Sequence, residues 1–237
     1  MYYGMYGYGF DGTYFLVLIG LVLCLGASAL VNSTMKKFHK VANCRNITGA
    51  DAARMILERE GLYDVSVEFL ENGGDHYDPR VNAVRLSREN FYSDSITAVS
   101  VAAHECGHAI QHAQGYWPIS LRTALVPVVN IGSRLGVPLI FIGVLLSWNQ
   151  TLINIGIWAF SLALLFQLVT LPVEFNASRR AVAKIEQYGL LGTQETEGAK
   201  KVLFAAALTY VAAAASSALQ LLRLILLYGG GGRRRRD

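Results

Sequence analysis

The longest stretch of the chain without a charged residue is Leu135–Val173. It limits the possible folds of the protein more than any other feature of the sequence. Its 39 residues include no Asp, Glu, Lys or Arg. A helix needs about 20 apolar residues to cross a bilayer, so this length predicts two spans. The polar segment Ser147–Gln150, with a tryptophan that suits the membrane interface, supplies the turn between them. We therefore expect a transmembrane hairpin.

A second apolar segment, Thr13–Val31, predicts a first membrane helix of 19 residues. Asp11 precedes it, whereas Lys36, Lys37 and Lys40 follow it. Because Lys and Arg gather on the cytoplasmic side of membrane helices, we expect the N-terminus outside and the next segment in the cytoplasm.

The apolar stretch Leu203–Leu222 leaves the number of spans open between three and four. It has no charge and is long enough to cross. A weakly polar stripe that includes Thr209 and Ser216 suits packing against other helices instead. The run Arg233–Arg236 also argues against placing the C-terminus outside.

Composition agrees with a membrane protein. Only 16% of the residues are charged, against about 25% in average soluble proteins. The net charge of +4 comes mostly from basic residues beside apolar segments, so it does not indicate nucleic-acid binding. Cys24, Cys44 and Cys106 are far apart, which excludes a disulfide framework and a CxxC zinc site.

A metal-binding motif, His104-Glu105-Cys106-Gly107-His108, lies in the polar segment between the first span and the hairpin. Residues four apart share one face of a helix, so the two histidines can bind one zinc ion. The glutamate beside them can act as the general base of a metallopeptidase. The sequence thus predicts one Zn²⁺ per chain, with His104 and His108 as ligands and Glu105 as the catalytic residue.

Catalytic zinc usually takes three protein ligands, and the third stays open among three residues. His112 continues the helical spacing, but it lies about 6 Å further along the helix from His108. His76 lies in a loop that could fold inward. Glu174 is favoured because it directly follows the hairpin, which returns the chain to the side of the membrane that carries the motif.

The polar region reads as a small α+β unit of short elements. In order, these are a helix capped by Thr48 that runs to about Glu60, a strand at Val65–Phe69, a turn at Asn72–Gly74, a strand at Val81–Leu86, and a helix capped by Ser93 or Asp94 that carries the motif and stops at Gly115. After the hairpin, a separate helix is expected from about Pro172 to Tyr188, and another from Thr193.

The chain therefore divides into consecutive segments. They are a Tyr/Gly-rich tail at 1–12, a transmembrane helix at 13–31, a domain with the HExxH helix at 32–118, a transmembrane hairpin at 119–173, a helix and linker at 174–200, an apolar helix at 201–228 and a Gly/Arg tail at 229–237. The fold class we expect is a mainly α membrane protein, with three or four transmembrane helices and a small α+β zinc-peptidase domain.

The sequence resembles the zinc-dependent membrane metallopeptidases of the YugP type, distant relatives of the HtpX and CAAX-prenyl-protease group of gluzincins. The resemblance covers nearly the whole chain. It rests on the HExxH motif, on Leu171–Arg180 (LPVEFNASRR) and on Asp75–Arg80 (DHYDPR). It implies a gluzincin-like domain in which Glu174 opens a helix and is the third zinc ligand.

The same resemblance assigns further site residues. Where the related group has an aspartate that orients a zinc histidine, this chain has Ser178, so Ser178 or Asn176 is expected in that role. The strand segment Val81, Asn82, Ala83 and Val84 resembles the edge strand that holds peptide substrates. Apart from the resemblance, the reaction needs a donor to the oxyanion besides zinc, and Tyr210, Arg179 and His76 are open candidates for it.

The predicted function is a membrane-embedded zinc endopeptidase that acts on membrane or misfolded proteins. We expect a multi-pass protein of a prokaryotic cell membrane with its catalytic domain on the cytoplasmic face. Its partners would be protein or peptide substrates and the lipid bilayer, with a second copy or another membrane protein as further candidates. The alternatives are a metal-stabilised scaffold and a site-two-type protease that cuts within the bilayer.

Overall fold

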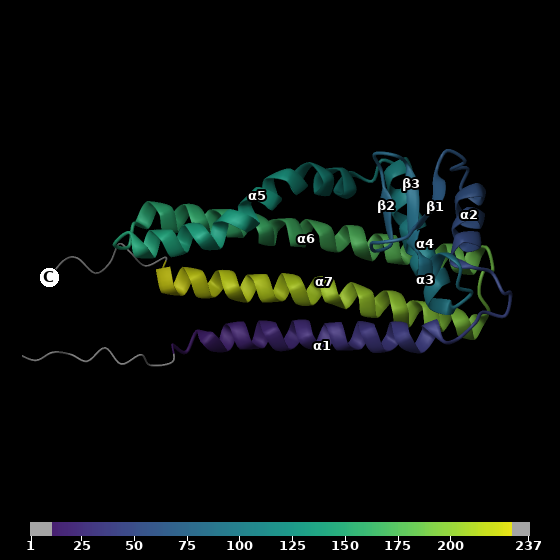
Figure 1. Ribbon diagram of the computed structural model, residues 1–237, viewed down its shortest axis with the longest axis horizontal. Helices are drawn as coiled ribbons and strands as arrows, with labels where there is room; N and C mark the ends of the chain where they lie inside the picture. The colour runs from purple at the N-terminus through teal and green to yellow at the C-terminus, as the bar shows by residue number, and fades with distance from the viewer. Residues whose placement is uncertain (1–10, 229–237) are drawn as a thin grey trace, which may run out of the picture.

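The computed structural model describes residues 11–228, apart from the side chains of residues 128, 131 and 133. Long helices lie lengthwise side by side, and a small sheet with short helices sits at one end (Figure 1). The elements in chain order are α1 (Tyr14–His39), α2 (Gly49–Arg59), β1 (Ser66–Leu70), β2 (His76–Asp78), β3 (Ala83–Ser87), α3 (Arg88–Phe91), α4 (Ile96–Ala113), α5 (Trp117–Leu145), α6 (Gln150–Gln187) and α7 (Thr193–Tyr228). Most of the predicted 1–12 tail and the whole 229–237 tail lie outside the described residues.

Three helices in the described part of the chain are long and apolar enough to span a membrane: α1, α6 and α7. In α5, Arg134–Leu145 is a shorter apolar segment. The helix α1 exposes large apolar side chains such as Phe15, Leu18 and Val22. A soluble protein rarely exposes so continuous an apolar surface, so these helices are suited to lipid. The fold class predicted from the sequence is confirmed.

The predicted hairpin is formed by α5 and α6, which pack side by side along their apolar halves (Figure 1). Ser147 and Trp148 adopt positive φ angles of 55° and 62° in the turn between them. Asn149 then caps α6, because its side chain accepts a hydrogen bond from the backbone N–H of Leu152 at 3.2 Å. The turn therefore lies at the polar residues where it was predicted.

One predicted boundary is wrong: no new helix starts at Pro172. The helix α6 runs unbroken from Gln150 to Gln187, with Pro172 inside it. A proline deletes one backbone N–H of the helical ladder, a loss that long apolar helices tolerate when their neighbours support them. Glu174 therefore belongs to the same helix as the second arm of the hairpin.

The capping predictions have mixed outcomes. Thr48 forms a capping box with Asp51 at the start of α2, as predicted, and Gly61 follows that helix with φ +73°. At α4 the cap is Ser95, whose hydroxyl accepts from the backbone N–H of Ala98 at 3.1 Å, rather than Ser93 or Asp94. The carbonyl groups of Ser93 and Asp94 instead accept hydrogen bonds from the backbone N–H groups of Gly49, the first residue of α2, and of Asn43 in the loop before α2.

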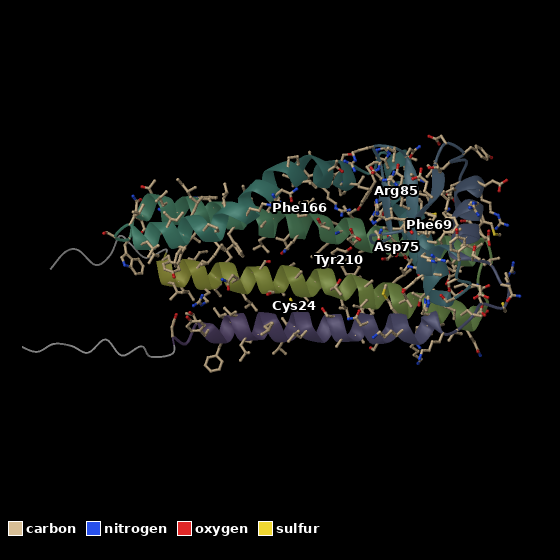
Figure 2. The ribbon with its side chains drawn as sticks, viewed as in Figure 1. Cys24, Phe69, Asp75, Arg85, Phe166 and Tyr210 are labelled. Carbon is tan, nitrogen blue, oxygen red and sulfur yellow. The ribbon has the colours of Figure 1, made fainter. Side chains whose placement is uncertain are left out.

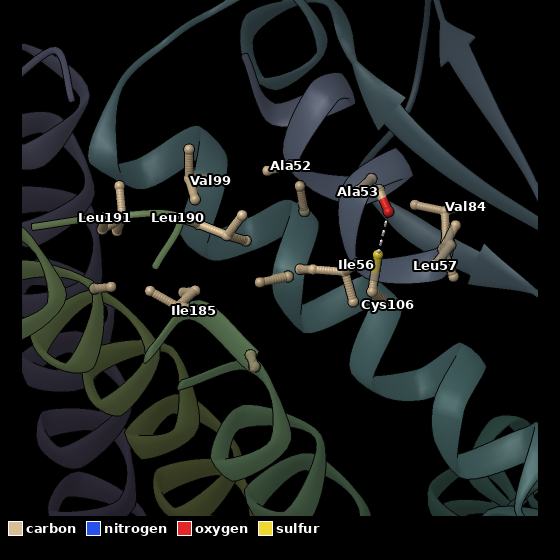
Figure 3. Packing of buried hydrophobic residues seen from close by; sticks show 14 of the residues in the cluster. Ala52, Ala53, Ile56, Leu57, Val84, Val99, Cys106, Ile185, Leu190 and Leu191 are labelled. Atoms are coloured by element: carbon tan, nitrogen blue, oxygen red, sulfur yellow. Dashed lines mark hydrogen bonds between the residues drawn. The ribbon is translucent and has the colours of Figure 1, made fainter. Parts of the chain in front are cut away.

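The core of the small domain lies between α2, α4, β3 and the ends of α6 and α7. Figure 3 shows Ile56 and Ala53 of α2 against Cys106 of α4, with Ile185 and Leu190 approaching from the other side. The Cys106 thiol is fully buried and donates to the carbonyl of Ala53 at 3.6 Å. Burial raises the pKa of this thiol, so Cys106 acts as a small apolar residue.

The strand order corrects the predicted substrate edge. The sheet runs β1-β3-β2, with β3 parallel to β1 and antiparallel to β2. Ala83 and Val84 therefore lie in the central strand, and Val81 and Asn82 form the turn before it. A central strand has both edges paired, so Val81–Val84 cannot take an added strand. The free edge near the motif is β2, which the sequence placed in a loop.

Candidate active site

The helix α4 carries both motif histidines on one face, as their spacing predicts. Their ring centroids are 4.8 Å apart, and their side chains are 16% and 10% exposed for His104 and His108. The Glu105 side chain is buried, and it lines the same cavity as the two histidines.

Glu174 of α6 reaches this pair. Its Oε2 lies 3.3 Å from His104 Nε2 and 3.6 Å from His108 Nε2. The approach depends on a glycine, because a Cβ atom on Gly107 would lie 2.6 Å from the carbonyl oxygen of Ala177 in α6. The helices α4 and α6 are thus close enough for three ligand atoms to lie within 4.8 Å of one another.

These three side chains fit a zinc ion. Glu174 Oε2 is buried and has no hydrogen-bond partner among the described residues, which is costly unless a cation neutralises it. Two imidazole nitrogens and one carboxylate oxygen form a typical ligand set of catalytic zinc. His104, His108 and Glu174 are the one group of three or more His, Cys, Asp or Glu residues in the described chain with this arrangement.

The proton on His108 is fixed by Gln111, a fully buried residue that the sequence analysis missed. The Gln111 side-chain nitrogen donates to the Val173 carbonyl at 2.8 Å and to Asn176 Oδ1 at 2.9 Å. Its oxygen therefore faces His108 Nδ1, 3.0 Å away, and accepts a proton from it. This leaves the Nε2 lone pair of His108 directed at the site.

His104 has a different partner. Ser178 Oγ lies 3.2 Å from His104 Nδ1, one helical turn after Glu174. This contact supports the orienting role expected of Ser178, which stays a prediction. Asn176 acts one step further away, because it contacts Gln111 rather than a histidine.

The outer edge of β2 faces Glu105, the glutamate of the HExxH motif. The backbone N–H of Tyr77 donates to Glu105 Oε2 at 3.0 Å. Tyr77 is opposite Val84 in the antiparallel ladder, and its N–H points away from that partner. Its carbonyl then points the same way, since both groups of such a residue face outward.

A cavity of about 580 Å³ opens at these residues. Its walls come from the β2 region, from α4 and from the first turns of α5, and they include His76, Tyr77, Ile119, Val126 and Tyr210. The ribbon of α5 arches away from α6 on this side, and Tyr210 lies near the middle of α7, beside the sheet domain (Figures 1 and 2). The cavity thus lies where the polar domain meets the long helices.

The remaining candidates separate into two groups. His76 and Tyr210 line the cavity. His112 also lines it, but its Nδ1 lies 3.3 Å from the Tyr77 hydroxyl and it is not part of the three-residue group. Arg179 lines a separate groove between α6 and α7 with Phe175 and Phe204, and Glu105 is not among the residues of that groove.

Charge within the site is concentrated on the carboxylates. Burial alone lowers the pKa of His108, but its contacts with Glu174 and the nearby Glu105 raise it above the ordinary value. A cation, Arg122 of α5, also reaches the site, with its Nη1 3.3 Å from Glu174 Oε1. This contact depends on how α5 packs against α6 and was not predicted from the sequence.

The fold and the site together define a membrane-associated class of metallopeptidase. The chain belongs to the family described as "Putative neutral zinc metallopeptidase", whose model matches residues 13–229. It is similar to the "Putative membrane protease YugP" of Bacillus subtilis (strain 168), with 48% identity over 198 residues that cover 83% of this chain and 88% of the relative. No solved structure matches the chain significantly.

Proposed function

We propose that the protein is a membrane zinc endopeptidase whose metal is held by His104, His108 and Glu174. One observation carries the proposal. His104 and His108 both face Oε2 of Glu174, a buried oxygen with no hydrogen-bond partner among the described residues, and Glu105 lies beside them. The family supports zinc and peptidase chemistry. When bound, zinc supplies a Lewis acid that polarises a carbonyl and makes water a better nucleophile.

Glu105 is the general base. Its Oε2 accepts from the Tyr77 N–H, which leaves Oε1 free to face the cavity. Glu105 takes a proton from the water that attacks the peptide carbonyl, and then passes it to the leaving nitrogen as the C–N bond breaks. Tyr210 and His76 line the cavity and are the proposed donors to the oxyanion.

The substrate backbone adds to the edge of β2 at Tyr77. In the described chain this edge of β2 pairs with no other strand and faces Glu105, to which the Tyr77 N–H donates, whereas both edges of the central strand β3 are paired. Strand addition holds a peptide by its main chain and therefore accepts many sequences. The wall formed by Ile119, Val126 and Pro127 of α5 favours apolar side chains, as segments of membrane or misfolded proteins provide.

The alternatives have less support. A site-two-type protease needs the motif in a membrane span, and α4 is not among the candidate spans of the described chain. A structural metal site needs no general base, whereas Glu105 is present and lines the cavity.

The test is proteolysis by the purified protein in lipid nanodiscs, with an unfolded membrane protein as substrate. Glu105→Gln should lower the rate by a factor of at least 10², the lower end of general-base contributions, with zinc content unchanged. Glu71→Gln, an exposed site outside the cavity, is the matched control. Unchanged cleavage by Glu105→Gln would refute the peptidase proposal.

Glu174 is tested by its metal. Zinc content measured by mass spectrometry should fall in Glu174→Ala, because the variant keeps only two of three ligands. Retention of one tightly bound zinc per chain would overturn the ligand assignment.

A further inference from the structure

The two oxygens of Glu174 have different surroundings. Oε2 faces both histidines, at 3.3 and 3.6 Å, whereas Oε1 faces Arg122 Nη1 at 3.3 Å. The carboxylate side chain is 3% exposed, so it lacks the water that would otherwise solvate a second oxygen. Arg122 is 34% exposed and lies on the cavity wall.

We propose that Arg122 is a positioning residue that reserves Oε1 of Glu174, so that the carboxylate offers the metal Oε2 alone. The inference rests on the proposed zinc site. A carboxylate can bind a metal through one oxygen or two. A guanidinium on Oε1 favours binding through Oε2 alone, because its rigid N–H groups hold Oε1 in a defined direction.

The chemistry of the other partners supports this role. The histidines are oriented by neutral groups, the Ser178 hydroxyl and the Gln111 amide. In the described residues, Arg122 is the one Lys or Arg within ion-pair distance of a proposed metal ligand. It therefore supplies both the direction of the carboxylate and a counter-charge to it.

The contact also has a structural consequence. Arg122 lies near the start of α5 (Trp117–Leu145), and its side chain reaches Glu174 of α6. The position of this arm of the hairpin is thus linked to the metal site through one ion pair.

The test compares Arg122→Gln and Arg122→Lys with Arg134→Gln, a control at an exposed position further along α5. Zinc affinity is measured by competition with a chromophoric chelator, and the coordination number by the visible spectrum of the cobalt-substituted protein. In Arg122→Gln, affinity should fall about 10- to 100-fold, as for other residues that orient metal ligands. The cobalt bands should also weaken, because Oε1 becomes free to join the metal.

Arg122→Lys keeps the charge but not the rigid geometry, so the same spectral change is expected to a smaller degree. It also serves as the deciding variant if Arg122→Gln does not fold. Unchanged zinc affinity and cobalt spectrum in the Arg122 variants, or an equal change in Arg134→Gln, would overturn the inference. If Glu174→Ala loses zinc while the Arg122 variants match the parent, only this inference fails. If Glu174→Ala keeps zinc, the proposed ligand set itself fails.

Discussion

The metal-site histidines are held by side chains that differ in burial and in number of contacts. Gln111 is fully buried and makes three hydrogen bonds, one with His108 in α4 and two with Val173 and Asn176 of α6. Ser178 is half-buried and makes one contact with His104. A residue that satisfies several buried groups is harder to replace than one with a single partner, because its loss leaves those groups unpaired.

We therefore expect Gln111→Leu to affect the site more than Ser178→Ala. Removing Gln111 leaves His108 and the Val173 carbonyl without their partner, which costs about 1–3 kcal/mol of stability. Zinc affinity should fall about 10- to 100-fold in the same variant. Chelator competition and thermal unfolding in detergent measure the two effects. A larger loss for Ser178→Ala would contradict this order.

A pH-dependent contribution lies at the other end of the β2 segment. Asp78 is buried, and its hydrogen bonds with Arg80 lower its pKa from 3.8 to about 2, with Arg85 adding a second cation. Because the folded-state pKa is depressed, this contribution to stability is complete above pH 4. It is lost as the pH falls from about 4 through about 2.

The check is unfolding of the parent and of Asp78→Asn across this range. The parent should be the more stable protein at pH 7, and the difference should shrink as the pH falls from 4 to 2. A difference that is constant with pH would show that the charge of Asp78 does not contribute.

At the level of helices, the site depends on how closely α4 approaches α6. The contact is made by the backbone of Gly107 and Ala177, in the middle of the HExxH motif. The glycine is thus required by the neighbouring helix rather than by its own φ angle. Since the three proposed ligands come from these two helices, their separation sets the geometry of the site.

Gly107→Ala should separate the helices. The new methyl group would lie 2.6 Å from the Ala177 carbonyl oxygen, and backbone must move to admit it. Overpacking of this kind costs about 1–3 kcal/mol, and zinc affinity should fall with it. Gly26→Ala in α1 is the matched control, because its Cβ meets nothing within 4 Å. Equal stability and zinc affinity in both variants would exclude this role of Gly107.

Features that depend only on residues close together in the sequence could be predicted from it. The spacing of His104 and His108 and the polar turn after Leu146 are of this kind. The strand order could not be predicted, because β2 has three residues and is a strand only through its pairing with β3. The predicted helix start at Pro172 was wrong for a related reason. From the sequence alone, a proline in the first turn of a helix cannot be told apart from a proline inside a helix that its neighbours support. The contacts of Gln111, Tyr77 and Arg122 depend on tertiary packing and left no local signal.

For the molecule in its membrane, the small domain lies at the end of α1 that carries Lys36 and Lys37 (Figure 1). These basic residues support a cytoplasmic position for the proposed active site. The cysteines of the protein allow a test of which side of the membrane the small domain faces. Cys44 is exposed, whereas Cys106 is buried and Cys24 lies within the apolar α1.

A membrane-impermeant thiol reagent should therefore label Cys44 only after the cells are permeabilised. Mass spectrometry of the labelled peptide measures the result, and Cys44→Ser controls for labelling elsewhere. Labelling of Cys44 in intact cells would place the domain on the outer face.

The unbroken course of α6 bears on where the proposed peptidase would cut a substrate. From Gln150 to Glu174 the helix rises about 36 Å, at 1.5 Å per residue, whereas the hydrocarbon of a bilayer is about 30 Å thick. With Gln150 at the far boundary, Glu174 stands about one helical turn above the near one. The length of α6 would then hold the proposed active site at a set height over the lipid. A protein anchored in the same bilayer would present to it the bonds just beyond the end of its own membrane segment, and bilayer thickness would select which bonds those are.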